Sequence, residues 1–252
     1  MKDLGDGSFV LGILILRDRS QGIHRLTQKS YINKVLSRFD MQDSKPGDTP
    51  VAKEDKFSLK QCPNNDLERK EMQKIPYVSV VGSLMDAQVC TRPDIAFIVG
   101  RYLSNPGMQY WKTAKRVMPY LRRTKDYMLT YQRSDSLEII GFSNSDFTGC
   151  QDSKRSTSSY IFMLGEGVIS WKFAKQTLIA SSTMVAEFIA SFEESNHEIR
   201  LRNFVTGLRM VDSIDMPLKI YSDNNSAVHY SSNNRSSVKF INIKFLVVKE
   251  KI

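Results

Sequence analysis

The most constraining feature of the sequence is the order of short apolar segments after residue 136. Segments of strand-like composition at 137–143, 159–164 and 168–172 predict three β-strands. The Gly165-Glu166-Gly167 turn lies between the second and third segments, which favours an antiparallel connection. We therefore expect a three-stranded antiparallel meander.

A long helix and a fourth strand follow this meander. Residues 182–208 have a helical pattern opened by a Ser/Thr cap, and residues 218–222 have the composition of a strand. A further short helix is expected at 226–232. This order of elements is typical of an α/β domain with a mixed sheet.

The first half of the chain is predicted to be mainly helical, although an apolar segment at its start resembles a strand. Helices are expected over 28–39 and 76–101, the second interrupted at Thr91-Arg92-Pro93-Asp94, where Thr91 or Asp94 could cap the helix that resumes. Residues 42–74 are polar and contain three prolines, and they predict a long loop.

Positive charge is concentrated in the first half of the chain. The net charge is +9, and residues 1–134 carry all of it. Such a balance hints at a polyanionic partner. Six cations lie on or just after a helix predicted over 111–124: Lys112, Lys115, Arg116, Arg122, Arg123 and Lys125.

This basic helix has two readings that the sequence leaves open. Its cations and neighbouring aromatic residues could bind nucleic acid weakly through phosphate contacts and occasional stacking. Alternatively, the cations form a solvated face and the aromatic residues enter the core. Pro119 lies within the helix, where an interior proline costs about 3 kcal/mol, so a kink or break is expected.

The apolar run at residues 8–16 also has two readings. It fits a buried β-strand, and its length also fits the hydrophobic region of a signal peptide. Asp3 and Asp6 offset the positive charge that a signal peptide carries before this region, and no small-residue cleavage site follows. No apolar run approaches the roughly 18–20 residues of a membrane span.

Several common kinds of site are excluded. The three cysteines are scattered and lack the spacing of a disulfide framework or a zinc site. No glycine-rich phosphate loop, nucleophile elbow or Cys/His dyad is visible.

Three polar segments could carry chemistry, because each lies at a strand end or in the first turn of a helix. They are 141–146, 181–188 and 221–224. If the first and fourth strands of the second half are adjacent, the sheet brings these segments together. Two-metal phosphodiesterase sites are assembled in this way, with carboxylates holding two Mg²⁺ ions.

The chain resembles the C-terminal part of the Pol polyprotein of copia-type LTR retrotransposons over nearly its whole length. The matching stretches are residues 1–5, 9–12, 81–85, 90–96, 155–158, 169–172 and the Ser-Ser-Thr-Met…Ala-Glu-Phe segment that opens the long helix. The resemblance implies a thumb/connection-like region of reverse transcriptase at 1–131. It implies an RNase H-like domain at 137–252 that lacks its last strand. The expected fold class is thus α/β, a truncated RNase H-like mixed sheet after a mainly helical region.

The resemblance also implies that catalysis is lost. The Tyr-x-Asp-Asp motif of the polymerase is absent, and the first metal-bridging Asp of the RNase H family falls on Asn144. Glu187 and Asp223 match the second and third carboxylates, and the chain stops before the fourth. We expect no enzyme activity, no metal site and no cofactor. Mg²⁺ would bind only if nuclease activity remains.

Two alternatives remain for the remnant carboxylates. Asp146 lies two residues after Asn144, on the same face of the predicted strand, and could replace the missing ligand. Otherwise Glu187 and Asp223 are leftover surface or cap residues.

The chain is also similar to copia-derived secreted RxLR-type effectors of plant-infecting oomycetes, although no Arg-x-Leu-Arg motif occurs. This similarity implies a non-catalytic interaction protein that acts inside plant host cells on cell death or immunity, with an unknown host protein as partner. It would be secreted if residues 8–16 serve as a signal, and otherwise cytoplasmic or nuclear. The alternative is a residual RNase H-type nuclease or a protein that binds RNA:DNA hybrids.

Overall fold

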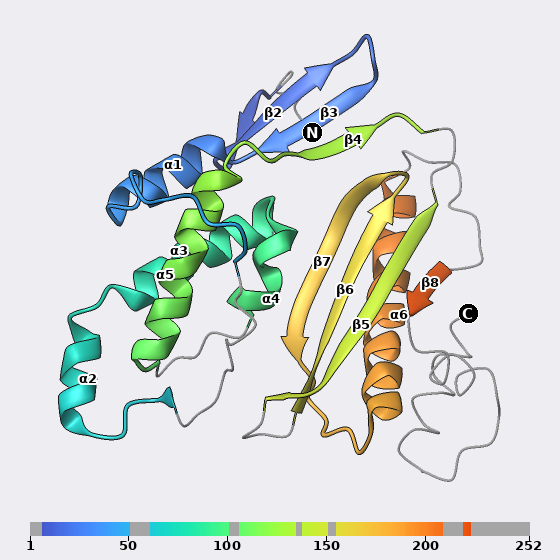
Figure 1. Cartoon of the computed structure of the whole chain (residues 1–252). Coiled ribbons are helices and arrows are strands. Elements are labelled where there is room, and N and C mark those ends of the chain that lie inside the picture. Colours follow the sequence, from blue (N-terminus) through green and yellow to red (C-terminus); the bar gives the residue numbers. More distant parts are fainter. Residues whose placement is uncertain are drawn as a thin grey trace. The chain divides into compact units, whose positions relative to one another are not determined.

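The computed structural model describes residues 7–50, 61–100, 106–134, 138–150, 155–208 and 219–222. The chain divides into two compact units, Met1–Tyr131 and Gln132–Ile252. Helices and strands are mixed along the chain, which confirms the α/β class (Figure 1).

The first unit contains a helical core and a small sheet. Its helices are α1 (Lys29–Arg38), α2 (Asp66–Gln73), α3 (Tyr77–Cys90), the 3₁₀ turn η2 (Pro93–Ile95), α4 (Ala96–Val99) and α5 (Met108–Arg123). Its sheet has the order β1-β2-β3-β4, formed by β1 (Phe9–Val10), β2 (Ile13–Asp18), β3 (Ile23–Thr27) and β4 (Leu129–Gln132). The helices predicted at 28–39 and 76–101 are confirmed.

Apolar residues at helical spacing build the core of this unit. On α5 the buried positions recur every three or four residues from Tyr110 through Val117 to Leu121. They pack against matching faces of α1 and α3, and the cluster includes Ile32, Val35, Leu36, Tyr77, Val80, Leu84, Ile95, Ile98, Ala114 and Met118.

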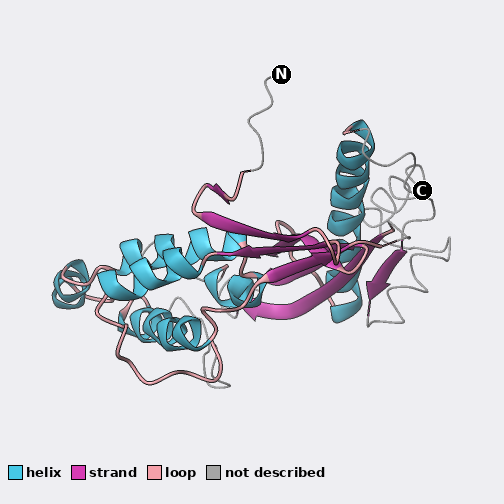
Figure 2. Cartoon of the chain, turned by 90° about the horizontal axis from the view of Figure 1, so that it is seen from above, coloured by secondary structure: helices cyan, strands magenta, loops and turns pink. Residues whose placement is uncertain are grey.

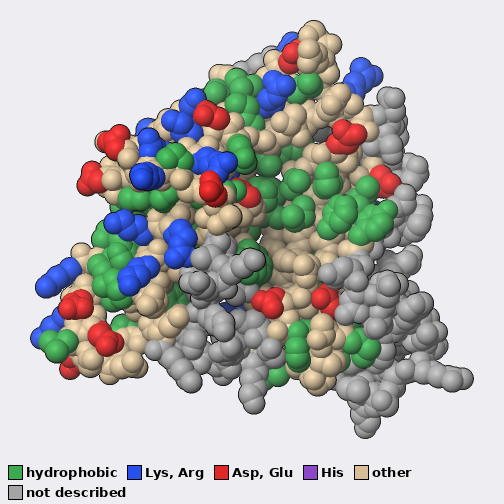
Figure 3. Space-filling view, in the orientation of Figure 1, with side chains coloured by type: hydrophobic (Ala, Val, Ile, Leu, Met, Phe, Trp, Pro, Cys, Tyr) green, Lys and Arg blue, Asp and Glu red, His purple; other side chains and the backbone are tan. Residues whose placement is uncertain are grey.

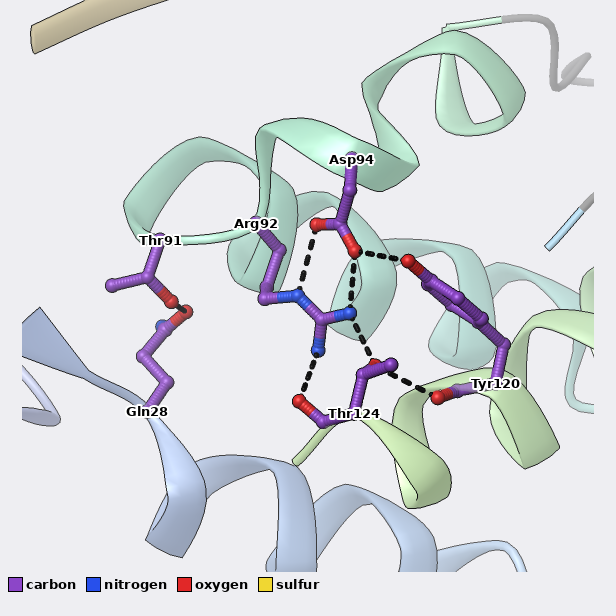
Figure 4. A network of polar contacts seen from close by, with 6 residues as sticks. All are labelled: Gln28, Thr91, Arg92, Asp94, Tyr120 and Thr124. Atoms are coloured by element: carbon purple, nitrogen blue, oxygen red, sulfur yellow. Dashed lines mark hydrogen bonds and ion pairs between the residues drawn. The ribbon is translucent and has the colours of Figure 1, made fainter. Parts of the chain in front are cut away.

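A buried arginine joins the start of η2 to the end of α5 (Figure 4). Arg92 is 1% exposed, and its Nε and Nη2 donate to the two oxygens of Asp94 at 2.9 and 2.6 Å. Nη1 donates to the carbonyl oxygen of Thr124, and Nη2 donates to its hydroxyl. The Tyr120 hydroxyl donates to Asp94 at 2.7 Å. The Arg92 guanidinium thus donates hydrogen bonds both to η2, at Asp94, and to the end of α5, at Thr124.

The predicted cap is therefore wrong. Neither η2 nor α4 receives a side-chain cap, and Thr91 donates its hydroxyl hydrogen to Gln28 at 2.7 Å instead. Asp94 forms the ion pair with Arg92 because the guanidinium offers a bidentate partner that the short helix does not.

Three further predictions for the first unit are corrected. Residues 42–74 contain α2, which begins after Asn65, whose side chain accepts from the Glu68 backbone N–H at 2.8 Å. The run at 8–16 is a hairpin and not one buried strand, since Leu11 and Gly12 adopt φ of 49° and 81° and reverse the chain. Its side chains Phe9, Val10, Leu11 and Leu16 are exposed. No break occurs at Pro119, which lies inside the continuous helix α5.

The second unit contains one mixed sheet and one long helix. The strands are β5 (Ile139–Cys150), β6 (Arg155–Leu164), β7 (Gly167–Lys175) and β8 (Lys219–Ser222), in the order β7-β6-β5-β8. The first three form the expected antiparallel meander, and β8 is parallel to β5. The condition set for bringing the polar segments together, adjacency of the first and fourth strands, is therefore met.

Helix α6 (Thr183–Gly207) covers one face of this sheet (Figures 1 and 2). The Ser182 side chain caps it by accepting from the backbone N–H of Val185, as the Ser/Thr cap predicted. Its buried residues Val185, Ala186, Phe188 and Ile189 form one cluster with Ala180, and Ile139, Tyr160 and Phe162 form another. The short helix predicted at 226–232 lies outside the described residues.

Candidate functional site

The candidate site expected around Asn144, Glu187 and Asp223 lies where the middle of β5 meets the first turns of α6. On β5 the side chains of Asn144 and Asp146 are exposed, which is consistent with one strand face. Their partners on β6 are Ser159 and Thr157. An amide and a carboxylate are therefore displayed at this part of the strand.

Glu187 approaches the same part of β5 from α6. It is 3% exposed, and its Oε1 accepts a hydrogen bond from the backbone N–H of Ser145 at 3.2 Å. The expectation that Glu187 is a surface or cap residue is wrong. The cap is Ser182, and the position five residues later faces the sheet because α6 packs along β5 and β6.

The parallel pairing of β8 with β5 completes what the structure describes of this site. Ser222, the last residue of β8, pairs with Ser143, which precedes Asn144. Asp223, the third remnant position, lies outside the described residues. Sheet topology thus brings the segments around residues 144, 187 and 222 together, as the sequence predicted.

The described residues do not form a metal cage. Within the part of the chain that the structure describes, no group of three His, Cys, Asp or Glu side chains could hold a metal ion. Mg²⁺ prefers several oxygen ligands including carboxylates, and a pair of such ions needs carboxylates to offset their charge. The neutral amide of Asn144 supplies no such charge.

The basic helix forms a second candidate surface on the first unit. Lys112, Lys115, Arg116 and Arg123 are exposed on α5, whereas Arg122 and Lys125 are half-buried. Arg123 forms an ion pair with Asp48. In Figure 3 blue Lys and Arg side chains gather over the helical unit. Spacing of three and four residues places the exposed cations along one side of the helix.

The aromatic residues near this helix mostly serve the core. Tyr110 is 2% exposed, and the Tyr120 hydroxyl donates to Asp94. Tyr127 is exposed, but its ring lies 5.9 Å from the Arg92 guanidinium carbon in a cation–π arrangement. The helix therefore offers phosphate contacts without a row of stacking rings.

A polar pair on the second unit was not expected from the sequence. The Ser170 hydroxyl and Nε2 of His197 lie 2.9 Å apart. Burial lowers the pKa of His197, and the positive charges of Lys172 and Arg200 lower it further. Burial and the two positive charges therefore disfavour the protonated form of His197.

The sheet face opposite α6 carries an exposed apolar row. The pairing of neighbouring strands places four residues side by side across the sheet: Trp171 on β7, Ile161 on β6, Phe142 on β5 and Tyr221 on β8. The Phe142 and Tyr221 rings stack with centroids 5.4 Å apart, and the two side chains are 45% and 55% exposed. Figure 3 shows green side chains over this part of the sheet. Such an exposed apolar row is a candidate contact surface.

Comparison with known proteins identifies the relatives of this chain. It is 38% identical to the retrovirus-related Pol polyprotein from transposon TNT 1-94 of Nicotiana tabacum over 259 aligned residues, which cover 100% of the chain and 19% of the relative. It is 30% identical to the Pol polyprotein from transposon RE2 of Arabidopsis thaliana, covering 17% of that relative. The chain thus spans less than a fifth of the length of these Pol relatives.

A shorter relative is matched over nearly its whole length. Secreted RxLR effector protein 161 of Plasmopara viticola is 38% identical over 133 residues, which cover 52% of this chain and 94% of the relative. No protein-family model matches the chain, and no solved structure matches it. None of the helices in the described ranges is both long and apolar enough to cross a membrane. The matches that cover the whole of this chain, together with the motifs noted above, show that the chain belongs to the copia-type, retrovirus-related Pol family.

Proposed function

We propose that this chain is a retroelement-derived protein that acts by binding and not by catalysis. One observation carries the proposal. At the position where the family resemblance expects the first metal-bridging carboxylate, β5 displays the amide of Asn144, and the neighbouring Glu187 is buried on the Ser145 backbone N–H. A carboxylate held in this way stabilises the contact between α6 and β5.

Magnesium calorimetry and an RNA:DNA-hybrid cleavage assay test this proposal together. We expect no tight two-site Mg²⁺ uptake by the full chain, and equal background cleavage by the wild type and by Glu187→Ala with Mg²⁺ or Mn²⁺. A matched Glu166→Ala variant controls for loss of an exposed carboxylate in the turn before β7. Cleavage that Glu187→Ala abolishes and Glu166→Ala retains would establish the residual-nuclease alternative.

The finer form of the proposal is a secreted effector that acts on a plant host protein and thereby on cell death or immunity. Support comes from the effector-named relative and from the exposed apolar row on the second unit, which suits a protein partner. Export can be tested by fusing residues 1–30 to a secretion reporter. Retention of the fusion in the producing cell contradicts export, whereas a Leu14→Asp variant that abolishes secretion supports the role of the apolar run.

Weak binding of nucleic acid is a second candidate function, favoured by the exposed cations of α5. Lys112, Lys115 and Arg116 present three charges on one side of the helix. Replacing all three with Gln should weaken hybrid binding and flatten its salt dependence, because each phosphate contact releases counterions. A control variant, Arg17→Gln with Arg19→Gln, removes exposed charge elsewhere. Equal salt slopes for all three proteins would argue against this function.

A further inference from the structure

Two buried carboxylates on α6 are not used by any proposed site. Glu194 and Glu198 are each 0% exposed and lie one helical turn apart, so both face the sheet. None of the side chains or backbone groups in the described ranges hydrogen-bonds to any of their four oxygens. An ionised carboxylate in such a place costs far more free energy than a protonated one.

Glu194 packs against the sheet at Gly141, where the lack of a side chain leaves room for its carboxyl group. Its Oε1 lies against Gly141 on β5, where a Cβ atom built on the glycine would come within 2.5 Å of it. The ring of Phe162 on β6 lies 2.9 Å from the same built position. The carboxyl group is therefore packed against backbone and an aromatic ring, which favours its neutral form.

We infer that the contact between α6 and its sheet is a proton-dependent joint, closed when Glu194 and Glu198 are protonated and loosened when they ionise. The electrostatics support this reading of the geometry. Burial raises the pKa of Glu194 to about 8, with the neighbouring Glu198 adding to the rise and the Ser143 hydroxyl opposing it. Burial also raises the pKa of Glu198 to about 7, against the charge of Arg202.

Other titratable groups around the pair come from three elements. From β6, the Tyr160 phenol has a pKa raised by burial to about 12 and stays neutral over the relevant range. From β7, Lys172 acts on His197. From α6 itself come Glu193, Arg200 and Arg202, which act on Tyr160, His197 and Glu198. On β5 the Ser143 hydroxyl, which does not titrate, lowers the pKa of Glu194.

The sign of the effect separates the glutamates from the histidine. A carboxyl group whose pKa is higher in the folded state favours folding most at low pH, and that contribution is lost as the pH rises from the unfolded value toward the folded one. His197 has a lowered pKa and therefore acts in the opposite direction, since its burial penalises the folded state in acid. If α6 loosens as the pH rises to about 8, the ionisation of the glutamates and not that of His197 explains the change.

Amide hydrogen exchange on the full chain measures the joint directly. After correction for intrinsic exchange rates, the opening constant of α6 should rise on the order of a hundredfold from about pH 6 to about pH 8, with α5 as internal reference. The double variant Glu194→Gln/Glu198→Gln keeps the side-chain volume and removes the titration, so its α6 should show no such rise. The matched variant Glu166→Gln, in the exposed turn before β7, should keep it.

A second measurement keeps the inference testable if the double variant fails to fold. The infrared carbonyl band of protonated carboxyl groups should be present in the folded wild type at about pH 6 and fade by about pH 9. An α6 opening constant that is flat with pH relative to α5, a double variant that behaves as the wild type, or the absence of this band at pH 6 would each overturn the inference.

Discussion

The backbone N–H of Ser145 donates a hydrogen bond to Oε1 of Glu187 at 3.2 Å, and this contact fastens α6 to β5. Among the candidate site carboxylates, Glu187 is buried and Asp146 is exposed, and Asp223 lies outside the described residues. A carboxylate used in this way has a structural role that can be measured apart from any role in metal binding.

Substituting Glu187 should therefore lower stability even without metal. Glu187→Ala removes the acceptor of a part-buried backbone donor, which costs about 1–3 kcal/mol, and Glu187→Gln should cost less because an amide oxygen still accepts. The two tryptophans allow each unit to be followed alone, so Trp171 fluorescence in a Trp111→Phe background reports the second unit. An unchanged denaturation midpoint in Glu187→Ala would contradict the structural role.

Replacing Arg92 should destabilise the first unit far more than replacing an exposed cation. Arg92 is buried and bidentate to Asp94, so Arg92→Ala leaves a carboxylate without its counter-charge. Breaking a buried pair in this way costs about 3–5 kcal/mol. The measurement is urea denaturation followed by Trp111 in a Trp171→Phe background. Lys115→Ala, on the exposed face of α5, is the control and should change stability by less than about 0.5 kcal/mol.

Asp94 should make the first unit sensitive to acid. Burial by itself would raise the pKa of Asp94, but the hydrogen bonds and charge of Arg92, with the Tyr120 hydroxyl, outweigh burial and hold the pKa below its usual value of 3.8. A lowered folded pKa stabilises the protein above the unfolded pKa, and that stability is lost as the pH falls through the folded value.

The measurement is the denaturation midpoint of the first unit from neutral pH to below about pH 3. The wild type should lose stability across the acid end, whereas Asp94→Asn should be less stable at neutral pH and show a smaller acid loss. Equal acid slopes for both proteins would mean that other carboxylates dominate the acid response.

The strands and helices of the second unit were predictable because their signals are local. These signals are apolar segments, a glycine turn and a Ser/Thr cap, and each involves only residues close together in the sequence. Tertiary packing did not override them. The mixed sheet followed from the order of these elements, whereas the parallel pairing of β8 with β5 is a finding of the structure. The sequence also placed Asn144 and Glu187 in neighbouring segments.

What the sequence missed depends on contacts between distant residues or on weak local signals. Helix α2 is polar and short, so hydrophobic periodicity gave no indication of it; the Asn65-x-x-Glu68 pattern, a capping-box variant, was the available signal. The burial of Glu194 and Glu198 could not be predicted, since helical glutamates are usually solvated. The burial of Arg92 could not be read from the helix interruption at 91–94, because its partner Thr124 lies 32 residues away in the sequence.

Pro119 lies inside α5 without ending it, and this predicts a stabilising substitution. Proline removes the backbone donor to the carbonyl of residue 115 and crowds that carbonyl, at a cost of about 3 kcal/mol in an ordinary helix. Pro119→Ala restores the donor and keeps Cβ. The Pro119 carbonyl oxygen, which accepts from the Gly47 backbone N–H at 3.1 Å, stays available.

We expect Pro119→Ala to raise the stability of the first unit by about 1–3 kcal/mol, because the restored hydrogen bond lies in a helix that already packs against α1 and α3. Trp111 fluorescence in the Trp171→Phe background measures the change. Gln109→Ala, an exposed position in the same helix, should gain only a few tenths of a kcal/mol from helix propensity. A lower midpoint for Pro119→Ala would mean that the proline ring contributes more by packing against the Gly47 loop than it costs in the helix.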